Sequence, residues 1–230
     1  LLVVGGRNSF ESGSYEGSSV ASMLPVSTGE GTDRSTNLVF AIDVSGSSEN
    51  GMDVQKAVTL SALDQLGDEN RVGLVGFNDR AYAVAPVQSL GENRGALENR
   101  VRRLQSGGRT DVSAGLHGAG EMLGDDPGTV VLVSDGHDRV GPASATAQRL
   151  RARGVQVIAI GAGANPAEDK LRTVARSGGG NYFRATETSR LGLLFGGSRT
   201  YEGSGLTVVD PNSFVTSGVE LTSNPGEVND

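Results

Sequence analysis

Short apolar runs alternate with amphipathic segments through the middle of the chain, and this alternation predicts the fold. Strand-like runs cover residues 37–42, 71–77, 129–134 and 155–160, and helical patterns cover residues 53–66, 95–104, 112–123, 143–153 and 167–175. The runs at 129–134 and 155–160 are apolar at nearly every position, which is typical of parallel strands that are covered on both faces. We therefore expect a doubly wound, mostly parallel α/β sheet with helices on both faces.

Two shorter segments complete the predicted sheet. Residues 81–87 alternate in polarity and contain Pro86, so we expect an antiparallel edge strand, where proline is tolerated. Residues 181–184 follow the glycine-rich stretch 177–180 and form the last predicted strand. In the first helix, the predicted inner side carries Val54, Ala57, Val58, Ser61 and Leu63.

Charge and composition exclude several classes of partner and reaction. The net charge is -7 and Lys occurs only at Lys56 and Lys170, which argues against nucleic acid as a partner. The sequence has no Cys, so disulfides, thiolate metal sites and a Cys nucleophile are absent. It has no run of about twenty apolar residues, so we expect no membrane-spanning segment in this chain. Because the chain begins with Leu1, we expect further sequence upstream, and no signal peptide can be identified.

Hydroxyl and carboxylate residues gather where predicted strands end or helices begin. The run 38–42 leads into Asp43-x-Ser45-x-Ser47, residues 107–111 bring Thr110 to the start of a helix, and the run 130–134 leads into Asp135. In an open parallel sheet, ligands bind outside the carboxyl ends of the strands where the strand order reverses. These loops can therefore converge on one ion, and their hard oxygen atoms suit Mg²⁺. Taken singly, each residue could instead be a helix cap.

Together, Asp43, Ser45, Ser47, Thr110 and Asp135 resemble the metal-ion-dependent adhesion site of von Willebrand factor type A domains, and the resemblance covers residues 36–195. It implies that Ser45 and Ser47 ligate the metal directly, Thr110 directly or through water, and the two aspartates mostly through water. It also implies that an open coordination position takes an Asp or Glu carboxylate from a partner protein. The ion would be Mg²⁺, with Mn²⁺ or Ca²⁺ as alternatives, and the domain would not be an enzyme.

The two ends of the chain carry a second resemblance. The segments Val3-Val-Gly-Gly6, Gly13-Ser-Tyr15 and Leu24-Pro25 resemble the start of a glutamine-amidotransferase-like domain, into which some prokaryotic membrane-anchored proteins insert a type A domain. Without Cys, such a host would be catalytically silent. We expect residues 1–35 and 199–230 to be flanks of a domain at 36–198, with their strand-like ends paired with each other or with sequence outside the chain. The resemblance implies a cell-surface or extracytoplasmic location, anchored by sequence outside this chain.

Two other functions stay open. Type A domains also serve in intracellular Mg²⁺-dependent assemblies, such as chelatases or chaperone-like complexes, which would make the location cytoplasmic. A hydrolase would need Ser134 or Ser45 beside His137 and Asp138, but the sequence offers no Gly-x-Ser-x-Gly elbow. We interpret Asp138 as a cap, whereas Asp111 could be a cap or an outer group that tunes the ion. The oligomeric state cannot be predicted.

Two motifs have simpler structural explanations. Arg100, Arg102 and Arg103 are interspersed with apolar residues on a predicted helix, so we interpret them as a solvated face and not as an anion site. Gly161-Ala-Gly163 lacks the third glycine of a dinucleotide-binding loop, so we interpret it as a tight turn.

Overall fold

The computed structural model describes residues 26–28, 35–46, 52–138, 140–195 and 206–208. The chain divides into two compact units, Arg34–Gly197 and a second unit made of Leu1–Asp33 with Ser198–Asp230. In the second unit, β1 (Val26–Thr28) pairs antiparallel with β8 (Leu206–Val208). The two flanks therefore pair with each other at these strands. The other flank segments quoted above lie outside the described residues.

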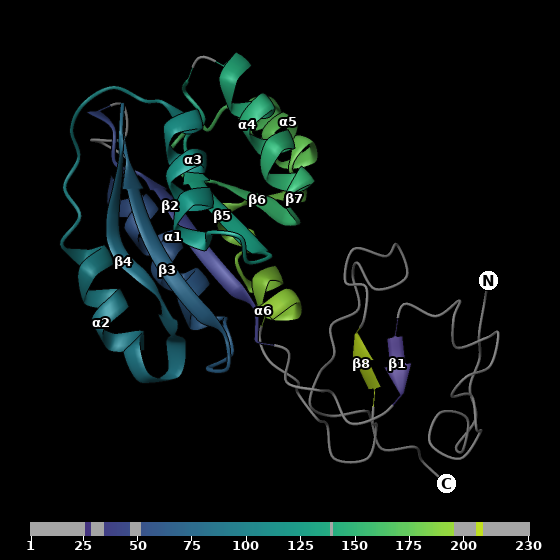
Figure 1. The fold of residues 1–230 in the computed structure, drawn as a ribbon. Coiled ribbons are helices and arrows are strands. Elements are labelled where there is room, and N and C mark those ends of the chain that lie inside the picture. The colour runs from purple at the N-terminus through teal and green to yellow at the C-terminus, as the bar shows by residue number, and fades with distance from the viewer. Residues whose placement is uncertain (1–25, 29–34, 47–51, 139, 196–205, 209–230) are drawn as a thin grey trace, which may run out of the picture. The chain divides into compact units, whose positions relative to one another are not determined.

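The larger unit is built on one six-stranded sheet (Figure 1). Its order is β4-β3-β2-β5-β6-β7, and every neighbouring pair is parallel except β3 and β4, which are antiparallel. This confirms the predicted fold class, including the antiparallel edge strand. The strands are β2 (Asn37–Asp43), β3 (Arg71–Phe77), β4 (Ala81–Ser89), β5 (Gly128–Ser134), β6 (Val155–Gly161) and β7 (Gly179–Arg184).

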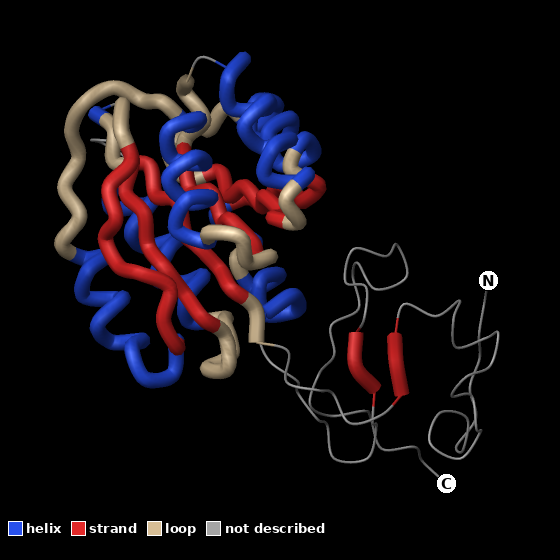
Figure 2. Tube along the Cα trace, in the orientation of Figure 1, coloured by secondary structure: helices blue, strands red, loops and turns tan. Residues whose placement is uncertain are grey.

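Helices cover both faces of this sheet, so the strands form the middle layer in Figure 2. The residues of β2 that face one way, including Phe40, pack with α1, α2 and α6, whereas Val39 and Ala41 pack with α3, α4 and α5. Because the central strands bury both faces, each needs apolar residues at consecutive positions. The helices are α1 (Met52–Asp64), α2 (Leu90–Arg102), α3 (Val112–Leu123), α4 (Val140–Ala152), α5 (Glu168–Ser177) and α6 (Ser189–Phe195), with a 3₁₀ turn η3 (Ala185–Glu187) before α6.

Two of the differences between the observed helices and the sequence prediction concern α1 and α2. The buried side of α1 carries Gln55 and Thr59, whereas Val54 is 39% exposed, so the predicted inner side was partly wrong. Thr59 can be buried because its hydroxyl donates to the Gln55 carbonyl over 2.8 Å. The second helix begins at Leu90 and not at residue 95, because Leu90 is fully buried and extends the apolar stripe by one more turn.

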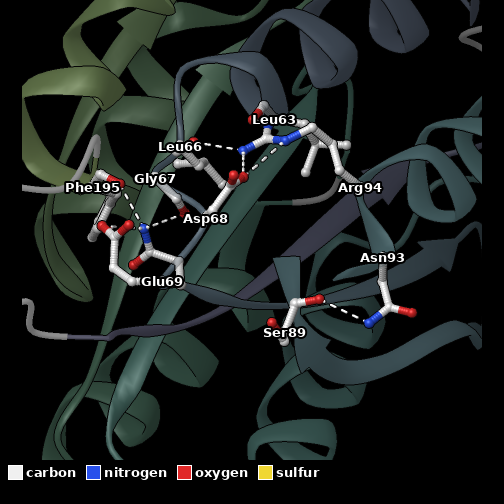
Figure 3. A network of polar contacts seen from close by, with 10 residues as sticks. Leu63, Leu66, Gly67, Asp68, Glu69, Ser89, Asn93, Arg94 and Phe195 are labelled. Carbon is white, nitrogen blue, oxygen red and sulfur yellow. Dashed lines mark hydrogen bonds and ion pairs between the residues drawn. The ribbon is translucent and has the colours of Figure 1, made fainter. Parts of the chain in front are cut away.

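Arg94 of α2 holds the carboxyl-terminal end of α1, as Figure 3 shows. Its guanidinium donates to the carbonyls of Leu63 and Leu66, the latter over 2.8 Å, and pairs with Asp68 over 2.7 Å. The Leu63 carbonyl also accepts from the Leu66 N–H over 3.2 Å, so Arg94 adds a second bond to the last turn of α1 and binds the turn that follows it. Arg94 therefore joins α1 to α2 through polar contacts as well as through the core.

The Arg94→Met variant is expected to lower the free energy of unfolding by about 2 kcal/mol, because hydrogen bonds to charged groups are stronger than neutral ones. Methionine keeps much of the apolar stem, so the change isolates the guanidinium. Urea denaturation measures the effect. The control is Arg102→Met on the same helix, where the exposed pair with Glu98 at 3.5 Å should contribute under about 0.5 kcal/mol. Equal losses of unfolding free energy in the two variants would show that the contacts of Arg94 stabilise the fold no more than an exposed ion pair does.

A second contact of the same turn holds the end of α6 (Figure 3). The Phe195 carbonyl accepts hydrogen bonds from the Gly67 backbone N–H over 2.8 Å and from the Asn70 side-chain amide over 2.6 Å. Leu191 of the same helix is fully buried against the core. These contacts stabilise a helix that the irregular sequence of residues 187–199 did not predict.

Candidate metal centre

The candidate site lies where the strand order of the sheet reverses. From β2 the chain proceeds to β3 and β4 on one side, and β5, β6 and β7 lie on the other. The last paired residues of β2 and β5 are Ile42 and Val133, so Asp43 and Ser134 follow side by side at the carboxyl ends of adjacent parallel strands. A crevice at such a switch point is where open α/β sheets bind ligands.

Asp43 is fully buried and both of its carboxylate oxygens accept hydrogen bonds. Oδ1 accepts from the Ser45 backbone N–H over 3.0 Å, and Oδ2 accepts from the Ser134 hydroxyl over 2.7 Å. Burial raises the pKa of Asp43 above its ordinary value, the hydrogen bonds from Ser45 and Ser134 oppose this rise, and the charge of Asp135 adds to it. These hydrogen bonds fix the position of the carboxylate. A cation bound beside it would stabilise its charged form.

Ser45 and Thr110 join the first two loops. The Thr110 hydroxyl donates to the Ser45 hydroxyl over 2.8 Å, although 65 residues separate them in the chain. Backbone bonds reinforce the contact, from Gly46 N–H to the Gly108 carbonyl (2.8 Å) and from Gly107 N–H to the Val44 carbonyl (2.7 Å). Gly108 has φ of 85°, a region that favours glycine, and a Cβ there would lie 2.6 Å from the Asn78 amide nitrogen. The two hydroxyls are therefore held on a tightly joined pair of loops.

Asn78 holds these loops and was missed by the sequence analysis. Asn78 follows β3, and its side-chain amide donates to the Gly107 carbonyl over 2.8 Å. Its backbone carbonyl accepts from Asp111 N–H over 2.8 Å. Its side-chain oxygen also accepts from the Tyr82 hydroxyl over 2.8 Å. The available signal was a polar side chain directly after a strand beside β2. Ser134 was missed for its bond to Asp43, although it too stands at the end of a strand.

Asp135 lies in the loop after β5 and is 8% exposed. Its carboxylate accepts from the His137 backbone N–H over 2.9 Å, and the His137 ring nitrogen Nδ1 lies 3.5 Å from the other carboxylate oxygen. Its carbonyl accepts from Ala167 N–H over 2.7 Å, which fixes the loop at the start of α5. The loop therefore holds the second aspartate just beyond the end of β5, where its charge adds to the rise in the pKa of Asp43.

The structure thus brings Asp43, Ser45 and Thr110 into one hydrogen-bonded group with Asp135 beside it, whereas Ser47 lies outside the described residues. Within the described ranges, no Lys or Arg forms an ion pair with either aspartate. The same ranges contain no group of three or more His, Asp or Glu placed to hold a metal, so a metal here would need the hydroxyls. The donor set is all oxygen, and among the described residues neither aspartate is paired with Lys or Arg, so the site fits a hard divalent cation.

The competing interpretations are weaker in this geometry. Ser134 is fully buried, and its hydroxyl accepts from Gly136 N–H over 3.0 Å and donates its proton to Asp43 and not to His137, which a hydrolase would need as the base. Asp111 is the N-cap of α3 and accepts from Ala114 N–H over 3.1 Å, which favours its capping role. Asp138 also caps α3, at Val112 N–H over 2.7 Å.

The arginines and the glycine-rich loop show structural roles. Arg100 donates to the Val84 carbonyl and Arg102 pairs with Glu98, in keeping with a solvated helix face. Gly163 has φ of 140° in the loop that leaves β6, and β6 does not continue directly into a helix there. The chain bends at residues 163–165, where the sequence indicated a turn.

An α/β domain with buried carboxylate and hydroxyl oxygens at its strand switch point is the class that the fold and the site define. Residues 37–196 match the family model of the von Willebrand factor type A domain. The chain belongs to this family. No curated protein matches the sequence.

Solved structures with the same fold come from varied organisms. An aerotolerance-related membrane protein from Bacteroides fragilis is 17% identical with a TM-score of 0.60, over 70% of this chain and 96% of that one. The PilB minor pilin from Streptococcus sanguinis is 16% identical with a TM-score of 0.56, over 72% and 60%. The manganese-loaded TRAP protein from Plasmodium vivax is 18% identical with a TM-score of 0.56, over 68% and 71%. At these identities the likeness shows the fold.

Proposed function

We propose that this domain is a protein-binding module whose activity depends on a divalent cation. The observation that carries the proposal is the buried Asp43 carboxylate, which lies beside a second aspartate and two joined hydroxyls without a basic partner in the described ranges. A buried anion without a counter-charge is costly, and a bound cation would offset that cost. The arrangement is therefore better suited to a domain that holds an ion than to one that works without it.

The residues of this chain would divide the work of binding. Ser45, Ser47 and Thr110 would supply neutral hydroxyl oxygens, and Asp43 and Asp135 would orient the site with their carboxylates. Because the hydroxyls carry no charge, a Mg²⁺ ion (or Mn²⁺ or Ca²⁺) would keep positive character and offer an open position to an anionic ligand. The partner would be a protein that presents an Asp or Glu side chain. The open position would receive this carboxylate, and no bond would be cut.

The comparisons support a binding function of this kind. The TRAP protein structure is manganese-loaded, the PilB protein is a pilin, and the Bacteroides protein is a membrane protein. We extend from these to a location at the cell surface or outside the cytoplasm, with the anchor in sequence outside this chain. None of the described helices is long and apolar enough to cross a membrane.

We further propose that the type A domain spans residues 36–198, close to the compact unit Arg34–Gly197, and that residues 1–35 and 199–230 belong to an amidotransferase-like host domain. The antiparallel pairing of β1 with β8 supports a common unit for the two flanks. Without Cys in the sequence, this unit would have no amidotransferase nucleophile.

Magnesium is expected to raise the melting temperature of the protein, because a ligand that binds only the folded state stabilises it by linkage. At a Mg²⁺ concentration one hundred times the Kd, the gain is about 2.7 kcal/mol, which corresponds to roughly 5–10 °C for a domain of this size. Melting curves between zero and 20 mM Mg²⁺ measure it, with Na⁺ at matched ionic strength as the control. Superimposed curves would refute the proposed function.

A further inference from the structure

Asp138 connects three elements around the candidate site. Its carboxylate oxygen Oδ2 accepts a hydrogen bond of 2.7 Å from the backbone N–H of Val112, the first residue of α3. Its backbone carbonyl accepts a bond of 3.0 Å from the Lys170 ammonium on α5. Its own N–H closes a turn onto the Gly136 carbonyl over 2.9 Å. Asp138 therefore fixes the loop after β5 to both α3 and α5.

The same contacts tie together two of the predicted metal ligands. Thr110 precedes Val112 by two residues, and Asp135 precedes Asp138 by three, so the bond between Asp138 and Val112 closes a short bridge from one ligand loop to the other. Thr110 is already joined to Ser45 by its hydroxyl, and Asp43 is joined to Ser134. The bridge through Asp138 is the corresponding link between the second and third loops.

The loop that carries Asp135 is held at both ends against α5. At its beginning, the Asp135 carbonyl accepts from Ala167 N–H, and at its end Lys170 donates to Asp138. Between them, Gly136 has φ of 73°, and a Cβ there would lie 2.9 Å from Cγ of Leu171. The backbone can therefore approach α5 this closely only with glycine, and the position of the Asp135 side chain depends on these anchors.

We propose that Asp138 is a positioning residue of the metal site, which sets the separation of Thr110 and Asp135 by accepting the Val112 N–H, with Lys170 as the second anchor of the same loop. This inference rests on the proposed metal-dependent function. Partners that orient metal ligands typically change metal affinity by 10–100-fold when removed, because the ligands must then be ordered at the time of binding. Asp138 thus acts on the ion through Thr110 and Asp135 and need not touch it.

The test is the Kd for Mg²⁺ of the full chain, measured by isothermal titration, together with the melting temperature without metal. The Asp138→Ala variant should weaken Mg²⁺ binding by about 10–100-fold. The Asp138→Asn variant should bind within about threefold of the wild type, because its amide oxygen can still accept from Val112 N–H. Lys170→Met should weaken binding while leaving the Asp138 carboxylate in place, which tests the second anchor separately.

Val101→Ala is the control for lost stability, since Val101 is fully buried in the core and lies on α2, which carries none of the predicted metal ligands. It should lower the melting temperature and leave the Mg²⁺ affinity unchanged. If Asp138→Ala behaves like this control, Asp138 is only a helix cap and the inference is overturned. If Asp138→Asn loses as much affinity as Asp138→Ala, charge and not position is responsible, and the inference again fails. A wild-type protein that does not bind Mg²⁺ refutes the proposed function itself.

Discussion

The Asp43→Asn variant is expected to lose the Mg²⁺-dependent rise in melting temperature while the metal-free protein becomes more stable than the wild type at pH 7. Asparagine has nearly the shape of aspartate, and its side-chain oxygen can accept the 3.0 Å bond from Ser45 N–H. In the wild type the Ser134 hydroxyl donates to Asp43 over 2.7 Å, and in the variant the asparagine amide can donate to this hydroxyl instead. The variant therefore keeps the packing but removes the negative charge that a cation would require.

The sign of the stability change follows from the pKa of Asp43. Burial raises the pKa in the folded state, so the folded protein binds this proton more tightly than the unfolded chain. The associated stability is fully present below the pKa of the unfolded chain and is lost as the pH rises through the higher folded value. At pH 7, which is above the ordinary pKa of an aspartate, the wild type carries this cost and the Asp43→Asn variant does not. The advantage of the variant should shrink as the pH falls toward 4.

Melting curves at pH 7 and at lower pH, with and without 20 mM Mg²⁺, measure both parts of this prediction. The control is Asp126→Asn, since Asp126 is exposed in the turn after α3 and its neutralisation should leave the Mg²⁺ response intact. A variant at Asp43 that retains the full Mg²⁺ shift would exclude this carboxylate from the site. A variant that is less stable than the wild type without metal would show that the ionised carboxylate is a net benefit in the fold.

The strands were predictable because they are short apolar runs in a sheet covered on both faces. The predicted bounds of β2 and β3 lie within one residue of the observed ones, since each strand is buried on both faces over most of its length. Helix ends were less predictable where the chain is polar. The first turn of α2 contains Gly91 and Glu92 after Leu90, so only the burial of Leu90 in the folded protein reveals that the helix has begun.

The α6 helix shows the same limit, because contacts distant in sequence stabilise it. Its last carbonyl is held by Gly67 and Asn70, more than 120 residues away. The candidate site likewise contains residues that the sequence identifies and residues that only the folded structure identifies. The residue types and spacing around Asp43 could be identified from the sequence, whereas the roles of Ser134 and Asn78 depend on which strands are neighbours. Periodicity gives the strands, but long-range pairing fixes their order.

The helix that follows Thr110 owes its position to small residues. In α3, a Cβ atom added at Gly115 would lie 2.4 Å from Cδ1 of Phe77, and one added at Gly118 would lie 2.4 Å from Cβ of Ala81. Phe77 is fully buried at the end of β3 and cannot move toward solvent without opening the core. Glycine costs a helix about 1 kcal/mol relative to alanine. Here close approach of α3 to the sheet offsets that cost.

Two identical substitutions are therefore expected to have opposite effects on the free energy of unfolding. Gly115→Ala should lower it by about 1–3 kcal/mol, because the added methyl group overpacks the core against Phe77 and outweighs the better helix propensity. Gly95→Ala should raise it by about 1 kcal/mol, since Gly95 lies inside α2 with nothing within 4 Å of the added atom. Urea denaturation of both variants measures the difference. Stabilisation by both would mean that α3 can move away from β3 without loss, and the position of Thr110 would then not depend on this close packing.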